Sequence, residues 1–270
     1  MTTTTLAGRP AGAARAGYGF RSAAAMEWRK LRSVRSTWWI LAAFAVALIG
    51  LAVIAGGHEG YARMSAADRA AFDPVHDSFI GLVIGQLLVG ALGVLTITAE
   101  FSSGMIRATF AAVPRRGIVL GAKAAVLGAV TLAAGEVTAF AALLAGQASL
   151  AASAPHATLA QPGVARAVAM AGAYPALVAL IGLGIGALIR HTAGALCALV
   201  GVLFVLPVLF VSPSLQDAAQ DFLPHPMANV LTEVRPPAGT LPLAVLFGLL
   251  CGYALLVLAA GGWALARRDA

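Results

Sequence analysis

The amino-acid sequence predicts an all-α, polytopic membrane protein with six transmembrane helices. Of its 270 residues, 60% are apolar and only 11% carry a charge, and the mean hydropathy is +0.88. Soluble domains are about 45–50% apolar and about 25% charged. This composition excludes a disordered chain, a basic protein that coats nucleic acid and an ordinary cytosolic enzyme. The apolar residues also gather in segments long enough to cross a bilayer.

Six segments qualify as spans, because a helix that crosses a hydrocarbon core of about 30 Å needs about 20 mainly apolar residues. They are apolar on all sides, which favours helices over the alternating strands of a membrane β-barrel. Only Arg190 and His191 separate the fourth span from the fifth, so a tight hairpin is predicted there. Residues 1–19 lack periodicity and are predicted to be a disordered tail. The spans are residues 38–55, 79–98, 118–145, 167–189, 192–211 and 241–265.

The net charge of +7 gives the orientation of these spans. Fourteen of the 18 Lys and Arg residues fall in the N-terminal segment, the second-to-third and fourth-to-fifth connections and the C-terminus, all on one side. Short cytoplasmic loops carry the excess of Lys and Arg. Both termini are therefore predicted to be cytoplasmic, and the positive charge indicates orientation rather than a nucleic-acid partner.

Residues 20–36 form a basic amphipathic segment just before the first span. Its apolar side chains recur every three or four residues, as on one face of a helix. A helix of this kind lies in the membrane interface. A basic flank that only sets the topology is the alternative. The apolar face comprises Phe20, Ala24, Trp28, Leu31 and Val34, while Arg21, Glu27, Arg29, Lys30, Arg32 and Arg35 largely occupy the rest.

The connection between the second and third spans contains a second short helix, at about residues 102–113. Ser102 or Ser103 can cap its start, and Pro114 ends it, because the residue before a proline avoids helical geometry. Ile106, Phe110 and Val113 share one face, and the apolar and basic surface of this helix has no evident partner within the chain. The helix is predicted to dock a soluble partner. The alternative is an interfacial helix that rests on lipid headgroups.

Two stretches, EWRKLRSVRSTWW at residues 27–39 and EFSSGMIRATFAAVPRR at residues 100–116, resemble the ABC-2-type transporter permeases, above all those of actinobacteria. With the six spans, the likeness extends from about residue 20 to the C-terminus. It implies a multi-pass permease domain at residues 37–270 in a bacterial cell membrane. Residues 212–240 are proline-rich and match the outer re-entrant region of the family only loosely.

The resemblance implies an exporter in which two permease subunits pair, as a homodimer or a heterodimer, and each engages a separate ATPase subunit. ATP and Mg²⁺ then belong to the ATPase, and this chain is neither an enzyme nor the holder of a cofactor. The segment after the second span corresponds to the coupling helix of the family, which fits a cleft on the ATPase. Its matching residues here are Glu100, Phe101, Gly104, Met105, Ile106, Arg107, Phe110, Pro114, Arg115 and Arg116.

The residues exclude some other functions and leave others open. The chain has no G-x-x-x-x-G-K-[ST] motif and no G-x-S-x-G nucleophile, and His58-Glu59 lacks the second histidine of H-E-x-x-H. A secondary transporter is expected to show internal repeats, and none relates the first three spans to the last three. An ATP-independent secondary transporter or a membrane scaffold is the alternative, and the transported substrate stays open.

Two polar residues inside the spans are further candidates. Glu136 lies midway in the third span, where an ionisable side chain costs at least about 2.5–3.5 kcal/mol. It is predicted to face the bundle interior, a polar cavity or a partner helix, as a contact for substrate or subunit or as a structural carboxyl. Gln86 is predicted to be structural. The small-residue pairs Gly81/Gly85, Gly182/Gly186 and Gly248/Gly252 would allow close helix approach, although such pairs also arise by chance in a chain with 30 glycines.

Overall fold

The computed structural model describes residues 19–57, 61, 65–113, 115–209, 221–237 and 239–267, and their regular structure is entirely helical. Six helices are long and apolar enough to cross a membrane, which confirms the predicted all-α fold and its six spans. Nearly all of the predicted tail and Pro114 lie outside the described residues. The six spans are α2 (Arg35–Gly56), α6 (Leu82–Ser102), α8 (Arg116–Ser149), α9 (Val164–Ile189), the segment Thr192–Leu209, and α14 (Leu243–Arg267).

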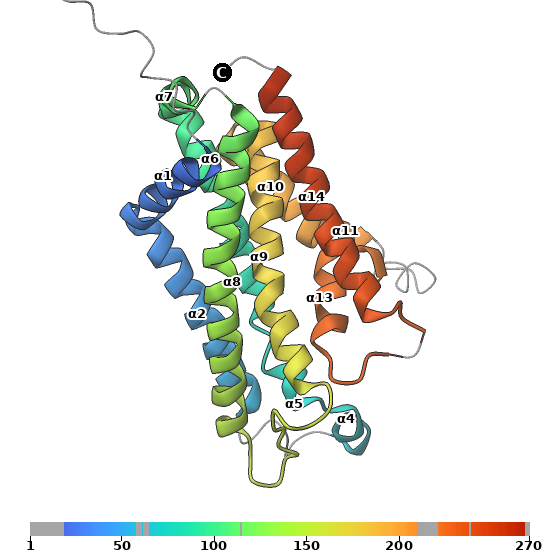
Figure 1. The fold of residues 1–270 in the computed structure, drawn as a ribbon. Coiled ribbons are helices and arrows are strands. Elements are labelled where there is room, and N and C mark those ends of the chain that lie inside the picture. Colours follow the sequence, from blue (N-terminus) through green and yellow to red (C-terminus); the bar gives the residue numbers. More distant parts are fainter. Residues whose placement is uncertain are drawn as a thin grey trace, which may run out of the picture.

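Among the described residues, five shorter helices flank the spans. They are α1 (Phe20–Ser33), α4 (Ala66–Ala71), α5 (Pro74–Asp77), α7 (Met105–Ala112) and α13 (Pro224–Thr232). Figure 1 shows α1, α7 and the C-terminal end of α14 at one end of the bundle, with α4 and α5 at the other. The predicted cytoplasmic side corresponds to the end with α1 and α7.

Helix α9 lies at the centre of the bundle, between α8 and α14 in Figure 1. Within its most apolar window 72% of the residues are buried, against 17% in α14. Small residues allow this position, because they let neighbouring backbones approach closely. A Cβ added at Gly182 would lie 2.2 Å from the Gly90 carbonyl oxygen of α6, and one at Gly135 of α8 would lie 2.2 Å from the Gly172 carbonyl oxygen.

The predicted hairpin between the fourth and fifth spans is confirmed. Arg190 ends α9 in the left-handed conformation, at φ 61°, and its N–H donates to the Gly186 carbonyl at 2.9 Å. The His191 ring caps the next helix by accepting from Gly194 N–H at 3.3 Å. Two residues thus reverse the chain completely.

The fifth span is one continuous segment of three pieces, α10 (Thr192–Val200), the π-helix η1 (Gly201–Val205) and α11 (Leu206–Leu209). Pro207 has no N–H, and a proline ring clashes with the carbonyl four residues earlier, here that of Leu203. The wider π-helical turn ends at Val205, two residues before this proline, and the Leu206 N–H reaches back to the Gly201 carbonyl. The proline therefore widens the span without breaking it.

Candidate functional site

Helix α1 is present as predicted, but the face that packs against the bundle shares only Leu31 with the predicted apolar face. The buried row is Ala23, Glu27 and Leu31. Phe20 and Trp28, on the predicted apolar face, are 49% and 43% exposed. The helix ends at Ser33, not at residue 36, because Val34 is extended, and α2 then leaves in a new direction (Figure 1). The acid of this basic segment therefore points inward.

Helix α7 begins without the predicted serine cap. The Ser102 and Ser103 hydroxyls instead donate to the Ala99 carbonyl, at 3.1 and 2.7 Å, and so close the end of α6. Gly104, at φ 70°, makes the turn and occupies the capping position of α7. The left-handed backbone conformation is favourable for glycine, which has no Cβ. This requirement explains why a glycine stands at this position in the EFSSGM stretch.

The apolar side of α7 packs within its own chain, so the prediction that it lacks a partner there is wrong. Ile106 and Val113 are buried, and Phe110 is partly buried against the core. The sequence predicted the apolar face correctly, but not that α6 and α8 would pack against this helix. The side that stays exposed comprises Met105, Arg107, Ala108, Ala111 and Ala112.

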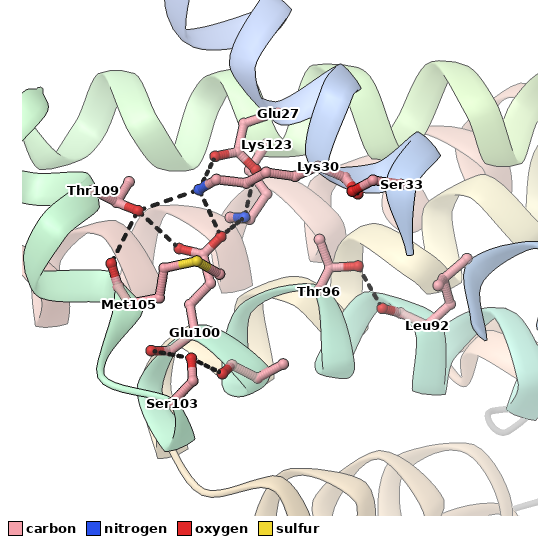
Figure 2. A network of polar contacts seen from close by, with 11 residues as sticks. Glu27, Lys30, Ser33, Leu92, Thr96, Glu100, Ser103, Met105, Thr109 and Lys123 are labelled. Atoms are coloured by element: carbon pink, nitrogen blue, oxygen red, sulfur yellow. Dashed lines mark hydrogen bonds and ion pairs between the residues drawn. The ribbon is translucent and has the colours of Figure 1, made fainter. Parts of the chain in front are cut away.

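Four charged side chains from three helices meet beneath α7, and Figure 2 shows them converging. Lys123 of α8 lies 2.5 Å from Glu27 Oε2 and 2.8 Å from Glu100 Oε1. Lys30 of α1 lies 3.0 Å from Glu27 Oε1 and 2.9 Å from Glu100 Oε1. We call Glu27, Lys30, Glu100 and Lys123 the ion-pair cluster. It joins α1, the end of α6 and α8.

The ion-pair cluster is deeply buried and electrically balanced. Glu27 and Glu100 are 3% exposed and Lys123 is 2% exposed, while the Lys30 side chain is 25% exposed. Burial by itself would lower the pKa of Lys30, but the hydrogen bond to Glu100 and the two carboxylate charges outweigh it and raise that pKa. A balanced cluster avoids the large penalty of an unpaired buried charge.

Thr109 connects α7 to the cluster. Its hydroxyl oxygen accepts from Lys30 Nζ at 3.2 Å. The same oxygen lies 3.4 Å from Glu100 Oε2 and 3.2 Å from the Met105 carbonyl oxygen, either of which can accept its proton (Figure 2). With this hydroxyl the site ties four helices together, α1, α6, α7 and α8.

Two arginines connect the same region to α14. Arg116 donates to the Leu265 carbonyl at 2.6 Å and lies over the Phe110 ring, 5.2 Å from its centroid. Arg190 donates to the Ala264 carbonyl at 2.9 Å and lies 5.2 Å from the Phe101 centroid. Cations placed at the end of a helix satisfy its last carbonyls. Arg115, at the start of α8, is exposed.

The ten predicted docking residues therefore divide by role. Glu100 and Ile106 are buried, Phe101 and Phe110 lie beneath arginines, and Gly104 forms the turn. Met105, Arg107 and Arg115 are exposed, Arg116 is partly buried, and Pro114 lies outside the described residues.

Sequence reasoning missed Lys123 and Thr109 as members of the site and placed Glu27 and Lys30 on the charged side of an interfacial helix. Two signals could have found the pairing. Glu27 is the one acid in the basic segment 20–36, and Lys123 stands alone within a long apolar run. Unpaired charges inside apolar segments are unfavourable, so each of these residues is expected to pair with a side chain of opposite charge.

The two candidates inside the spans lie elsewhere. Gln86 is fully buried, accepts from the Tyr174 hydroxyl and lies 3.1 Å, through Nε2, from His225 Nδ1. It thereby joins α6, α9 and α13. Glu136 is half-buried against Gly172 of α9, where an added Cβ would lie 2.5 Å from the Glu136 carboxyl carbon. Within the part of the chain that the structure describes, its carboxyl forms no hydrogen bond.

A cavity of about 760 Å³ opens at the other end of the bundle, between α5, residues 155–161 and the segment after α13. Its carboxyl groups have different surroundings. Asp73 accepts from the N–H groups of Val75, His76 and Val234, at 2.9, 3.1 and 3.0 Å. Asp77 forms no side-chain hydrogen bond with the described residues. Burial, with a contribution from the Asp73 charge, raises its pKa despite the opposing effect of His76.

Asp77→Asn is expected to raise the thermal unfolding temperature at about pH 7. The pKa of Asp77 is raised in the folded state, so its ionised form opposes folding, and stability is lost as pH rises above the ordinary value of 3.8. The gain should vanish near pH 3, where an aspartic acid is largely protonated in the unfolded chain as well. Tryptophan fluorescence of the detergent-solubilised protein measures both curves.

Asp73→Asn is the matched control. Its amide cannot accept from the Val234 N–H as the second carboxylate oxygen does, so this variant should be less stable than the wild type at the same pH. A lower unfolding temperature for Asp77→Asn at about pH 7 would contradict the assignment.

No family model matches this chain, and no curated protein is significantly similar to it. The interpretation of the site therefore rests on its geometry.

Proposed function

We propose that this chain is the transmembrane permease subunit of an ATP-binding-cassette exporter and that the exposed side of α7 docks a separate ATPase subunit. The observation that carries the proposal is that α7 is anchored on one side and open on the other. Thr109 joins it to the ion-pair cluster and Ile106 is buried, whereas Arg107, Ala108 and Ala111 face outward.

This arrangement suits an element that transmits movement. A displacement of α7 would reach α1 and α8 through the ion-pair cluster and α6 through the short Ser103–Gly104 turn. Rigid-body switching between two packed arrangements then needs no flexible intermediate. In this proposal the end with α1 and α7 is cytoplasmic, a second permease copy completes the pathway, and ATP and Mg²⁺ bind to the partner.

The test is co-purification from native membranes with α7 altered on its open side. Arg107→Glu combined with Ala111→Glu places two negative charges on the docking surface without touching the buried face. An affinity-tagged wild-type chain should retain an ATPase with a Walker A motif, identified by mass spectrometry. The double variant should lose it about tenfold or more, because a mismatched charge across an interface costs several kcal/mol.

Arg235→Glu is the matched control, since it reverses an exposed arginine at the opposite end of the bundle. It should retain the ATPase, and all three chains should share one unfolding temperature. Ile106→Asp is unsuitable as a docking variant, because Ile106 is buried and an aspartate there would disturb the fold. Wild-type membranes that yield no such ATPase would favour the ATP-independent transporter or scaffold. A double variant that keeps the ATPase would contradict docking through the exposed side of α7.

A further inference from the structure

A second cavity, of about 200 Å³, lies beside the ion-pair cluster. It is enclosed by α1, α2, α6 and α8, and most of its walls are apolar, with Leu31, Ile40, Leu92 and Leu95 among them. The charges at its inner end are those of the cluster, which neutralise one another. The interior therefore suits a hydrocarbon chain better than a polar solute.

The cavity reaches the surface beside the junction of α1 and α2. Of the residues that line it, Val34 and Ser36 at this junction are exposed, as are Ala99 and Met105 where α6 meets α7. The opening therefore lies between these two turns. We call this cavity, with its opening, the junction pocket.

The charge around the opening is positive. Arg32 and Arg35 flank Val34 and are both exposed, and the structure shows no ion pair for either of them with a described residue. The nearby acids, Glu27 and Glu100, are buried and paired with lysines. The first turn of α2 carries no acidic side chain and no side-chain cap, so its amide groups add to the positive potential.

Tryptophans place the opening at a membrane boundary. Trp38 and Trp39, in the first turns of α2, are 48% and 75% exposed, and Trp38 Nε1 donates to the Arg32 carbonyl at 3.1 Å. Exposed tryptophans gather where a membrane meets water. An occupant of the junction pocket thus has its apolar part at hydrocarbon level and its head beside the arginines.

We propose that the junction pocket binds one anionic phospholipid, with an acyl chain between α1 and α6 and the phosphate held by Arg32 and Arg35. Arginine forks match phosphate oxygens. A tail is as well accommodated in the bilayer as in the pocket, so the headgroup charge sets the preference. The assignment needs only a membrane on this side of the bundle and is independent of any ATPase.

The test is native mass spectrometry of the purified chain after incubation with equal amounts of phosphatidylglycerol and phosphatidylcholine that carry the same acyl chains. The wild type should retain phosphatidylglycerol preferentially. Arg32→Gln combined with Arg35→Gln should remove the preference, with about a tenfold loss or more of bound phosphatidylglycerol. Arg235→Gln, which neutralises an exposed arginine at the opposite end, should bind as the wild type does.

Two further variants test the cavity itself. Leu95→Trp fills it, and Ser36→Trp blocks its opening from an exposed position, so it leaves the core intact. Both should lose the lipid, whereas Leu255→Trp, on the exposed side of α14, should not. Free glycerol phosphate should not displace the lipid if the chain is held. Retention of phosphatidylglycerol by the double arginine variant or by Ser36→Trp would overturn the proposal.

Discussion

Lys123→Met is expected to lower the free energy of unfolding by about 3–5 kcal/mol, the usual loss when one partner of a buried ion pair is removed. Lys123 contacts both carboxylates of the cluster, at 2.5 and 2.8 Å, and is itself 2% exposed. Without it, Glu27 and Glu100 would share only Lys30, which is partly open to solvent. Thermal or denaturant unfolding in mixed micelles measures the loss.

Two further chains show whether the loss comes from the cluster. Arg29→Met removes an exposed charge of α1 and should change stability by less than about 0.5 kcal/mol. Glu27→Gln combined with Lys123→Met removes one charge of each sign and leaves Lys30 with Glu100. The double variant should be less destabilised than the sum of its single variants, since residues in one network couple strongly. Strict additivity, or a Lys123→Met chain as stable as Arg29→Met, would contradict the argument.

Lys123→Met also tests how the ion-pair cluster holds α7. Thr109 joins α7 to the cluster through Lys30 and Glu100. When the cluster is unbalanced, α7 should open more readily, because local stability follows the contacts that hold an element. Faster hydrogen exchange of residues 105–112 in Lys123→Met, with α9 unchanged, is the expected signature. An unchanged exchange rate would mean that the apolar contacts of Ile106, Phe110 and Val113 hold α7 without the cluster.

The six spans could be predicted from the sequence because the length and composition of an apolar run are local properties. The hairpin at Arg190 and His191 followed from the same reasoning, since two residues separate two runs that are each long enough to cross. The limits of some spans differ from the predicted ones. α8, for example, extends to Ser149, beyond the predicted end at residue 145.

Which face of a short helix packs against the bundle could not be predicted in the same way, because it depends on residues far away in the sequence. α1 turns Glu27 inward since Lys123, 96 positions later, neutralises it. A hydrophobic pattern alone favours the row with Phe20 and Trp28. Likewise the apolar face of α7 could be predicted from its own sequence, but the helices α1 and α8 that lie beside it could not.

The three glycine pairs show the same limit. Their spacing is identical, yet their surroundings differ. The pair Gly81/Gly85 packs against Leu48 and Phe44 of α2, and Gly182/Gly186 packs against α6. Nothing lies within 4 Å of a Cβ added at Gly248 or Gly252. A small-residue spacing therefore permits a close crossing without specifying one.

Gly182→Ala should consequently destabilise the protein, whereas Gly248→Ala should not. At Gly182 the new methyl would meet the Gly90 carbonyl oxygen at 2.2 Å and the Gly90 carbonyl carbon at 3.1 Å. These are backbone atoms, so α6 and α9 would have to separate. Overpacking of this kind costs about 1–3 kcal/mol, while the higher helix propensity of alanine returns at most about 1 kcal/mol.

Gly93→Ala, on the same crossing, should behave like Gly182→Ala, since its methyl would lie 2.0 Å from the Ala179 carbonyl oxygen. Gly248→Ala adds the same atom to a helix with open space around it, so only the propensity gain remains. Unfolding temperatures of the three chains in one detergent compare the effects directly. If Gly248→Ala fell as far as Gly182→Ala, the loss would belong to glycine in a membrane helix generally and not to the contact between α6 and α9.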